Sequence, residues 1–245
     1  VYGGSTKQNT TTESIVVLRS GSFAAVYGAG TKTQNRASTV SMPVDSTAVV
    51  DKLFGAGSAG GDVTGDVTVQ VLGGTVKAPV YGGGEGAGVT GSATVKVSND
   101  AIESAGSVYG GGKGGQVTKG TTVTVTVPNK ANAGTFDLDT ISGSGTNADG
   151  STLADNVTGT KNVSIAMKDA NSTGILQLQN LTGFDNLTLG DENTKAFNSS
   201  VFKVKSRFDS KATDPAGLEE RTGKVVLDDS SLILNGDYNG HIGSM

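Results

Sequence analysis

The sequence contains no cysteine, a single histidine and only 4 prolines among its 245 residues. Without cysteine, neither a disulfide framework nor a thiolate metal site is available, so stability must come from stacked strands. The only histidine, His241, has no cysteine with which to form a nucleophilic dyad and no second histidine with which to share a metal. These absences argue against a catalytic triad and against a histidine-rich metal site.

An excess of basic charge and long apolar runs are also missing. The 19 lysines and arginines are outnumbered by 23 aspartates and glutamates, which gives a net charge of −4, and they form no stripe that could neutralise a row of phosphates. No stretch approaches the roughly 18 consecutive apolar residues of a membrane span, and the N-terminus lacks the basic and hydrophobic regions of a signal peptide. We therefore expect neither nucleic acid as a partner nor insertion of this sequence into a membrane.

Glycine, in contrast, is abundant. It supplies 38 residues, about twice its usual share of roughly 7%. The glycines do not recur in a Gly-X-Y pattern, and prolines are few, so the composition excludes collagen and indicates many tight turns.

The glycines concentrate in a five-residue motif, Val-Tyr-Gly-Gly-Gly in its fullest form. The motif begins at Val1, Val26, Leu53, Val80 and Val108, and reads VYGGS, VYGAG, LFGAG, VYGGG and VYGGG. Successive starts are therefore 25, 27, 27 and 28 residues apart. A period between about 20 and 50 residues is typical of repeat architectures, in which each unit buries its apolar edge against the next. The motif predicts a β-solenoid.

Each repeat unit has the pattern of one solenoid coil. Residues 68–71, 94–97 and 122–127 alternate apolar and polar side chains at period two, as half-buried strands do. A polar turn and a short strand that ends in the pentad complete the unit, which gives about three short strands per coil of about 27 residues. Stacking of such coils would align Val69 and Val95 with Val123 or Val125 as continuous apolar columns.

The repeat is regular only in the first part of the sequence. We predict regular glycine-rich coils over residues 1–135 and irregular coils with longer loops over residues 136–245, with a separate β domain in the second region as the alternative. The sequence opens on Val1 and Tyr2, in the middle of a repeat. Because natural solenoid ends carry atypical capping units, we expect this chain to be a fragment of a longer one.

The units VYGGGEGAGVTGSATVKVS and VYGGGKGGQVTKGTTVTVTV resemble the glycine-rich repeats of large bacterial surface proteins, the adhesin-like β-helices of secreted and cell-wall-anchored proteins. The resemblance covers roughly residues 1–135. It implies an all-β, right-handed parallel β-helix displayed outside the cell, on the bacterial surface or secreted, as a stalk or adhesive segment. It supplies no ligand, because these families share no active-site motif that could be transferred to this sequence. One unit is repeated without a distinctive catalytic insertion, so we favour a non-catalytic surface protein that binds host or microbial glycans or surface proteins.

One position of the pentad is always aromatic. The residues at this position are Tyr2, Tyr27, Phe54, Tyr81 and Tyr109. Because adjacent strand residues face opposite ways, the valine column and the aromatic column cannot both point into the coil. With valine inside, the rings would form a surface row on which glycan rings could stack, and we take these five residues as the candidate ligand-binding site. The alternative is a structural ladder that packs under the turns and fixes the strand register.

Acidic residues support a second hypothesis, a β-helix glycosidase or lyase that cleaves polysaccharides. Asp137 and Asp139 point to the same face of a strand, so they could flank a sugar or hold Ca²⁺. The irregular region offers the remaining candidates: Lys203, Lys205, Arg207 and Asp209. A third hypothesis is a purely structural spacer without a ligand.

Residues 60–66, Gly-Gly-Asp-Val-Thr-Gly-Asp, weakly resemble the calcium-binding nonapeptide repeats of secreted toxins. The nine-residue period is missing, and Ser92 and Gly120 stand where Asp66 should recur. Calcium is therefore possible but unsupported, and the sequence predicts no metal and no other cofactor.

Overall fold

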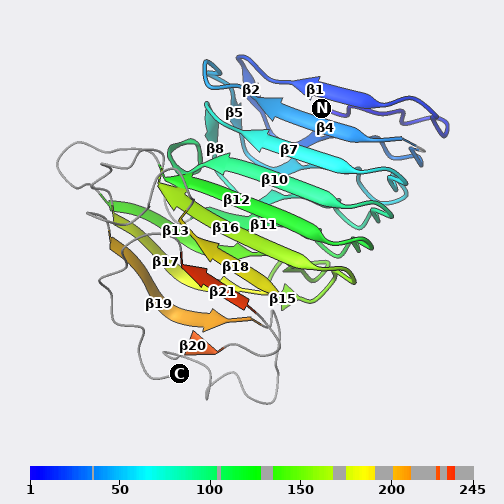
Figure 1. Ribbon diagram of the computed structural model, residues 1–245. Helices are drawn as coiled ribbons and strands as arrows, with labels where there is room; N and C mark the ends of the chain where they lie inside the picture. Colours follow the sequence, from blue (N-terminus) through cyan, green and yellow to red (C-terminus); the bar gives the residue numbers. More distant parts are fainter. Residues whose placement is uncertain are drawn as a thin grey trace.

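The computed structural model is an all-β parallel solenoid of about six turns, with roughly 28 residues per turn, which confirms the predicted fold class (Figure 1). It describes residues 1–34, 36–103, 106–127, 135–167, 175–190, 201–210, 225–226 and 231–234. Within these ranges no helix is long and apolar enough to cross a membrane. The only helical element in them is a 3₁₀ turn, η1 (Asn99–Ala101).

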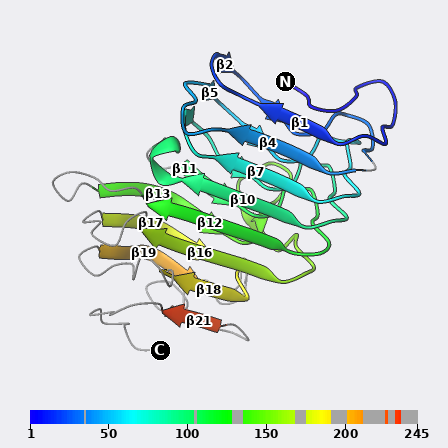
Figure 2. The same cartoon turned by 45° about the horizontal axis from the view of Figure 1, so that its top comes forward.

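Two long parallel sheets form the walls of the solenoid (Figures 1 and 2). In spatial order the first contains β1 (Ser14–Val17), β4 (Ser38–Met42), β7 (Val67–Val71), β10 (Ala93–Ser98), β12 (Thr121–Val127), β16 (Lys161–Met167), β18 (Asn186–Leu189) and β21 (Ser231–Leu234). The second contains β3 (Val26–Tyr27), β6 (Leu53–Phe54), β9 (Val80–Tyr81), β11 (Gly106–Tyr109), β13 (Thr135–Ser142), β17 (Ile175–Thr182), β19 (Val201–Asp209) and β20 (Val225–Val226). Every strand pairing within them is parallel, as coil-on-coil stacking requires.

A third, narrow sheet closes the first coils. It consists of β2 (Ser22–Phe23), β5 (Val49–Val50) and β8 (Thr75–Val76). Each of these coils therefore has three short strands, as the sequence predicts. In the next coil, Ile102 continues the stack with a single bridge to Val76.

The core is built from aligned valines. Val95 pairs with Val69 on one side and with Val123 on the other, which selects Val123 over Val125 as the member of this column. All of these side chains are buried, and the residues between them face outward. Since burial of one such side chain stabilises the fold by roughly 1.5–3 kcal/mol, each coil that adds a valine to the column adds to the stability of this thin core.

The third residue of the pentad is glycine because the backbones of consecutive coils come very close there. A Cβ atom on Gly82 would lie 2.3 Å from the carbonyl oxygen of Gly110, and one on Gly55 would lie 2.4 Å from the carbonyl oxygen of Gly82. Neither glycine has a positive φ, so close approach rather than turn geometry requires the residue. Ser38 adds a cross-coil contact at this corner, since its hydroxyl donates to the Gly55 carbonyl at 2.7 Å.

The sheets continue beyond residue 135, but the coil length becomes irregular. Val108 pairs with Ile141, and Ile141 pairs with Leu181, so the spacing grows from 28 residues after Val80 to 33 and then to 40. It falls back to 27 where Leu181 pairs with Phe208. The sixth pentad is therefore Ile141-Ser142-Gly143-Ser144-Gly145, six residues later than Thr135, where the regular period would place it. The division of the chain into regular coils over residues 1–135 and irregular coils over residues 136–245 stays a prediction.

Candidate functional site

The aromatic residues of the pentad form one continuous stack along the solenoid. Ring centroids from Tyr2 through Tyr27, Phe54 and Tyr81 to Tyr109 are successively 4.8, 5.1, 5.1 and 4.9 Å apart, and adjacent ring planes differ by at most 17°. Parallel coils in strict register place each ring over the next. The face of every inner ring is therefore occupied by its neighbours.

The stack lies outside the valine core and is itself buried. As the alternation of strand side chains requires, the first residue of the four pentads that begin at positions 26, 53, 80 and 108 joins the main core, and the aromatic residue of each joins a second cluster. The last four rings are at most 8% exposed, and Ala25 and Leu153 pack against them. Only Tyr2 is open to solvent, with 42% of its surface exposed. The structure thus has a buried ladder of rings, the arrangement that the sequence offered as the alternative. Register fixing by this ladder and ligand binding by the five residues both stay predictions.

Polar side chains from later coils reach back over the stack. The Tyr27 hydroxyl donates a hydrogen bond to the carboxylate of Glu85, whose other oxygen lies 3.0 Å from the Lys113 ammonium group. The Tyr81 hydroxyl and the Thr146 hydroxyl are 3.2 Å apart. These contacts join residues 28 to 65 positions apart in the chain, so they tie several coils together.

The tyrosine–glutamate contact changes the proton affinity of both groups. Burial, followed by the hydrogen bond to Glu85, raises the pKa of Tyr27 well above its ordinary value. Burial by itself would raise the pKa of Glu85 too, but the hydrogen bonds from Tyr27 and Lys113 outweigh it and leave this pKa lowered. Glu85 is therefore ionised at neutral pH and already satisfied by two donors.

A hairpin interrupts the repeat beside the stack. It is formed by β14 (Gly145–Thr146) and β15 (Leu153–Ala154), the one antiparallel pair among the described strands. The Asn147 side chain shapes the loop, since its oxygen accepts hydrogen bonds from the backbone of Gly150 and Ser151 at 3.0 and 3.1 Å. Gly150 has a φ of +81°, and a Cβ atom there would lie 3.1 Å from the Lys113 side chain. The loop therefore packs closely against the side chain of Lys113.

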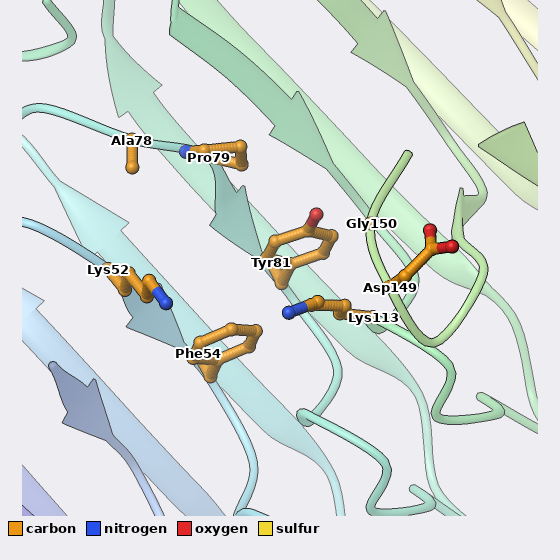
Figure 3. A pocket seen from close by; sticks show the side chains of 8 residues that line it. All are labelled: Lys52, Phe54, Ala78, Pro79, Tyr81, Lys113, Asp149 and Gly150. Atoms are coloured by element: carbon orange, nitrogen blue, oxygen red, sulfur yellow. The ribbon is translucent and has the colours of Figure 1, made fainter. Parts of the chain in front are cut away.

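A surface pocket of about 260 Å³ lies between this hairpin and the aromatic stack. It is lined by Lys52, Phe54, Ala78, Pro79, Tyr81, Lys113, Asp149 and Gly150 (Figure 3). The ammonium groups of Lys52 and Lys113 point toward each other beside the rings, and Asp149 stands on the far side of Lys113 (Figure 3). The pocket combines ring edges, a proline, cationic groups and a carboxylate, which can bind a small polar ligand.

Lys52 and Asp149 are the accessible charges of this pocket. Both side chains are exposed, and hydrogen bonds from the side chain and backbone of Ser151 hold the pKa of Asp149 below its ordinary value. Lys113 is less available, because its side chain is 20% exposed and is paired with Glu85. Sequence reasoning missed this site, since residues 52 and 149 are brought together only by coil stacking and by the fold-back of the hairpin.

The carboxylates proposed for polysaccharide cleavage are spread along the second sheet. Asp137 accepts a hydrogen bond from Gln177 of the next coil, and Asp139 accepts one from Thr140 at 3.0 Å. Asp209 is fully buried and stands at the opposite end of its strand from Lys203, which lies in the column of Asp137. The side chains of Lys203, Lys205 and Arg207 lie outside the described residues, as does His241.

The aspartates of the calcium-like segment make contacts between coils. Asp62 accepts a hydrogen bond from the backbone of Gly88 at 2.7 Å. Asp66 accepts two from Ser92, at 2.8 Å from the backbone nitrogen and 2.9 Å from the hydroxyl. Over the described part of the chain, no three His, Cys, Asp or Glu residues gather as metal ligands would. Both aspartates therefore serve the stacking of β7 and β10.

Comparison with known proteins adds no relative. No protein family, no curated protein and no solved structure matched the chain.

Proposed function

We propose that this chain is a non-catalytic segment of a bacterial cell-surface or secreted protein, in which the solenoid is a stalk that presents a binding site for glycans or host proteins. The observation that carries the proposal is one repeated unit interrupted by a hairpin that builds a pocket. A bare spacer needs only the repeat, whereas the hairpin adds accessible charged groups over the aromatic stack.

The stalk part of the proposal rests on the continuity of the sheets and of the hydrophobic core from coil to coil. Two eight-stranded parallel sheets run through the coils with one hydrophobic core between them, so each coil is held by its neighbours on both sides. The aromatic stack adds a second line of contacts along the same axis. Such a rod can hold a binding site at a fixed distance from its point of attachment.

The adhesive part of the proposal cannot be tested by removal of the aromatic rings. Replacement of Tyr81 and Tyr109 with alanine would remove buried rings, so lost binding could not be separated from lost stability. The whole, unmodified chain should instead be labelled and applied to glycan arrays and to host and microbial cells. We expect saturable binding that unlabelled chain displaces. Absence of binding on every surface would favour the spacer.

Cleavage of polysaccharides is the competing activity. Incubation of the chain with plant, host and bacterial polysaccharides should release no new reducing ends and no unsaturated uronates. Appearance of either product, and its loss in Asp137→Asn or Asp139→Asn, would replace the adhesin proposal with the enzyme.

A further inference from the structure

We propose that the pocket under hairpin β14–β15 binds one acidic sugar residue, a sugar that carries a carboxylate such as a uronic acid. Lys52 would hold the carboxylate of the sugar, and Asp149 would accept hydrogen bonds from its hydroxyls. The inference rests on the proposed glycan-binding function and assigns to it a site and a ligand class.

The size and construction of the pocket favour a small ligand. Its volume of about 260 Å³ lies just below the usual range for small-molecule sites, roughly 300–1,000 Å³, which suits a single sugar residue better than a folded partner. Its walls come from three successive coils and from the hairpin, and their backbones are fixed by strand pairing. A rigid site of this kind loses little conformational entropy when it binds.

The stacked rings decide how a sugar could be recognised there. Phe54 and Tyr81 contribute ring edges to the pocket, because their faces are covered by each other and by the next rings. Stacking of a sugar on an aromatic face, the mode that the sequence suggests, is therefore not available in this pocket. Together with Pro79, the rings supply only apolar contact. Affinity and specificity must come from the charged groups.

Lys52 is the cation available to a ligand. Among the described residues it has no ion-pair partner, whereas Lys113 is paired with Glu85. Glu85 in turn is shared between Lys113 and Tyr27. Lys52 interacts with Glu85 through its charge, but no ion pair or hydrogen bond occupies its ammonium group among the described residues. An incoming carboxylate can therefore accept a hydrogen bond from it, and a hydrogen bond to a charged group is roughly twice as strong as a neutral one.

Asp149 restricts which anion is accepted. Its carboxylate offers about four acceptor positions, more than Ser151 occupies, and it needs donors such as hydroxyl groups. The same negative charge repels a dianion such as phosphate. One free cation beside one exposed carboxylate thus matches a ligand with a single negative charge and neighbouring hydroxyls, which is the chemistry of an acidic sugar.

The test is calorimetric titration of the whole chain with oligosaccharides of glucuronic or galacturonic acid, with the matching neutral oligosaccharides, and with inorganic phosphate. We expect binding of an acidic oligosaccharide only. Lys52→Gln should weaken it by about threefold or more, because solvent screens the charge of an exposed lysine and makes its ion pairs weaker than buried ones. Asp149→Asn should also weaken it.

Lys77→Gln is the matched control, since Lys77 is another exposed lysine that pairs with Asp51 and does not line the pocket. It should leave the affinity unchanged, and circular dichroism should show that all variants are folded. Equal binding of neutral sugars, equal binding of phosphate, or full affinity in Lys52→Gln would overturn the inference. If glycans bind the chain but ignore Lys52 and Asp149, the proposed function survives without this site. If no glycan and no cell binds, both fail.

Discussion

Replacement of Phe54 with alanine tests whether the aromatic stack holds the coils together. The ring is 1% exposed and lies between Tyr27 and Tyr81, with both centroid distances at 5.1 Å. Phe→Ala substitutions in cores cost about 3–5 kcal/mol. Because the backbone on both sides is fixed in parallel strands, the gap cannot close easily, and we expect a value in the upper half of this range.

Phe54→Tyr is the control, since tyrosine occupies this position in four other pentads and Phe54 lines the pocket toward which the added hydroxyl would lie. It should change the free energy of unfolding by less than about 1 kcal/mol. Urea unfolding followed by circular dichroism and by tyrosine fluorescence measures both values, and two probes are needed because repeat proteins can unfold in parts. A cost below about 1 kcal/mol for Phe54→Ala would refute a stabilising role of the stack.

Other substitutions and titrations test the remaining contacts. Gly82→Ala should lower the free energy of unfolding by about 1–3 kcal/mol, because the new Cβ would collide with the Gly110 carbonyl; unchanged urea unfolding would contradict this. Because the pKa of Glu85 is lowered in the folded state, its stabilising effect is present above the ordinary glutamate pKa of about 4.3 and is lost as the pH falls below it. The stability difference between wild type and Glu85→Gln should therefore shrink in acid, and a constant difference would rule the ion pair out. Burial raises the pKa of Tyr27 and of Tyr81, so the protonated rings stabilise the fold up to the ordinary tyrosine pKa of about 10 and this effect is lost at higher pH. Phenolate absorbance of these rings should appear only well above that pH and together with unfolding; normal titration of every tyrosine would show that the stack is open.

The solenoid could be predicted from the sequence because its determinants are local and repeated. Period-two alternation around Val95 and the recurring pentads fix strands, coil length and register without knowledge of distant contacts. The sixth pentad could not be recognised from the sequence because Ser142 replaces the aromatic residue and because the strand that leads into it, β13, is longer than β11. The burial of the stack was left open because alternation gives the direction of a side chain but not what covers it.

The pocket could not be predicted in the same way. Asn147-Ala148-Asp149-Gly150 has the residue types of a turn, which a sequence reader can recognise. Its position over Tyr81, however, follows from the stacking of later coils onto earlier ones and from the contact of Gly150 with Lys113. Neither the stacking of the coils over Tyr81 nor the contact between Gly150 and Lys113 can be derived from the local sequence.

The hairpin distinguishes a binding segment from a bare rod, so the most direct measurement is the affinity of a chain without its loop. Thr146 and Leu153 are directly paired, so replacement of residues 147–152 by Asn-Gly leaves a two-residue hairpin turn. We expect this chain to keep the unfolding transition of the parent and to lose its affinity for uronic acid oligosaccharides by about tenfold or more. Full affinity without the loop would contradict the assignment of the site.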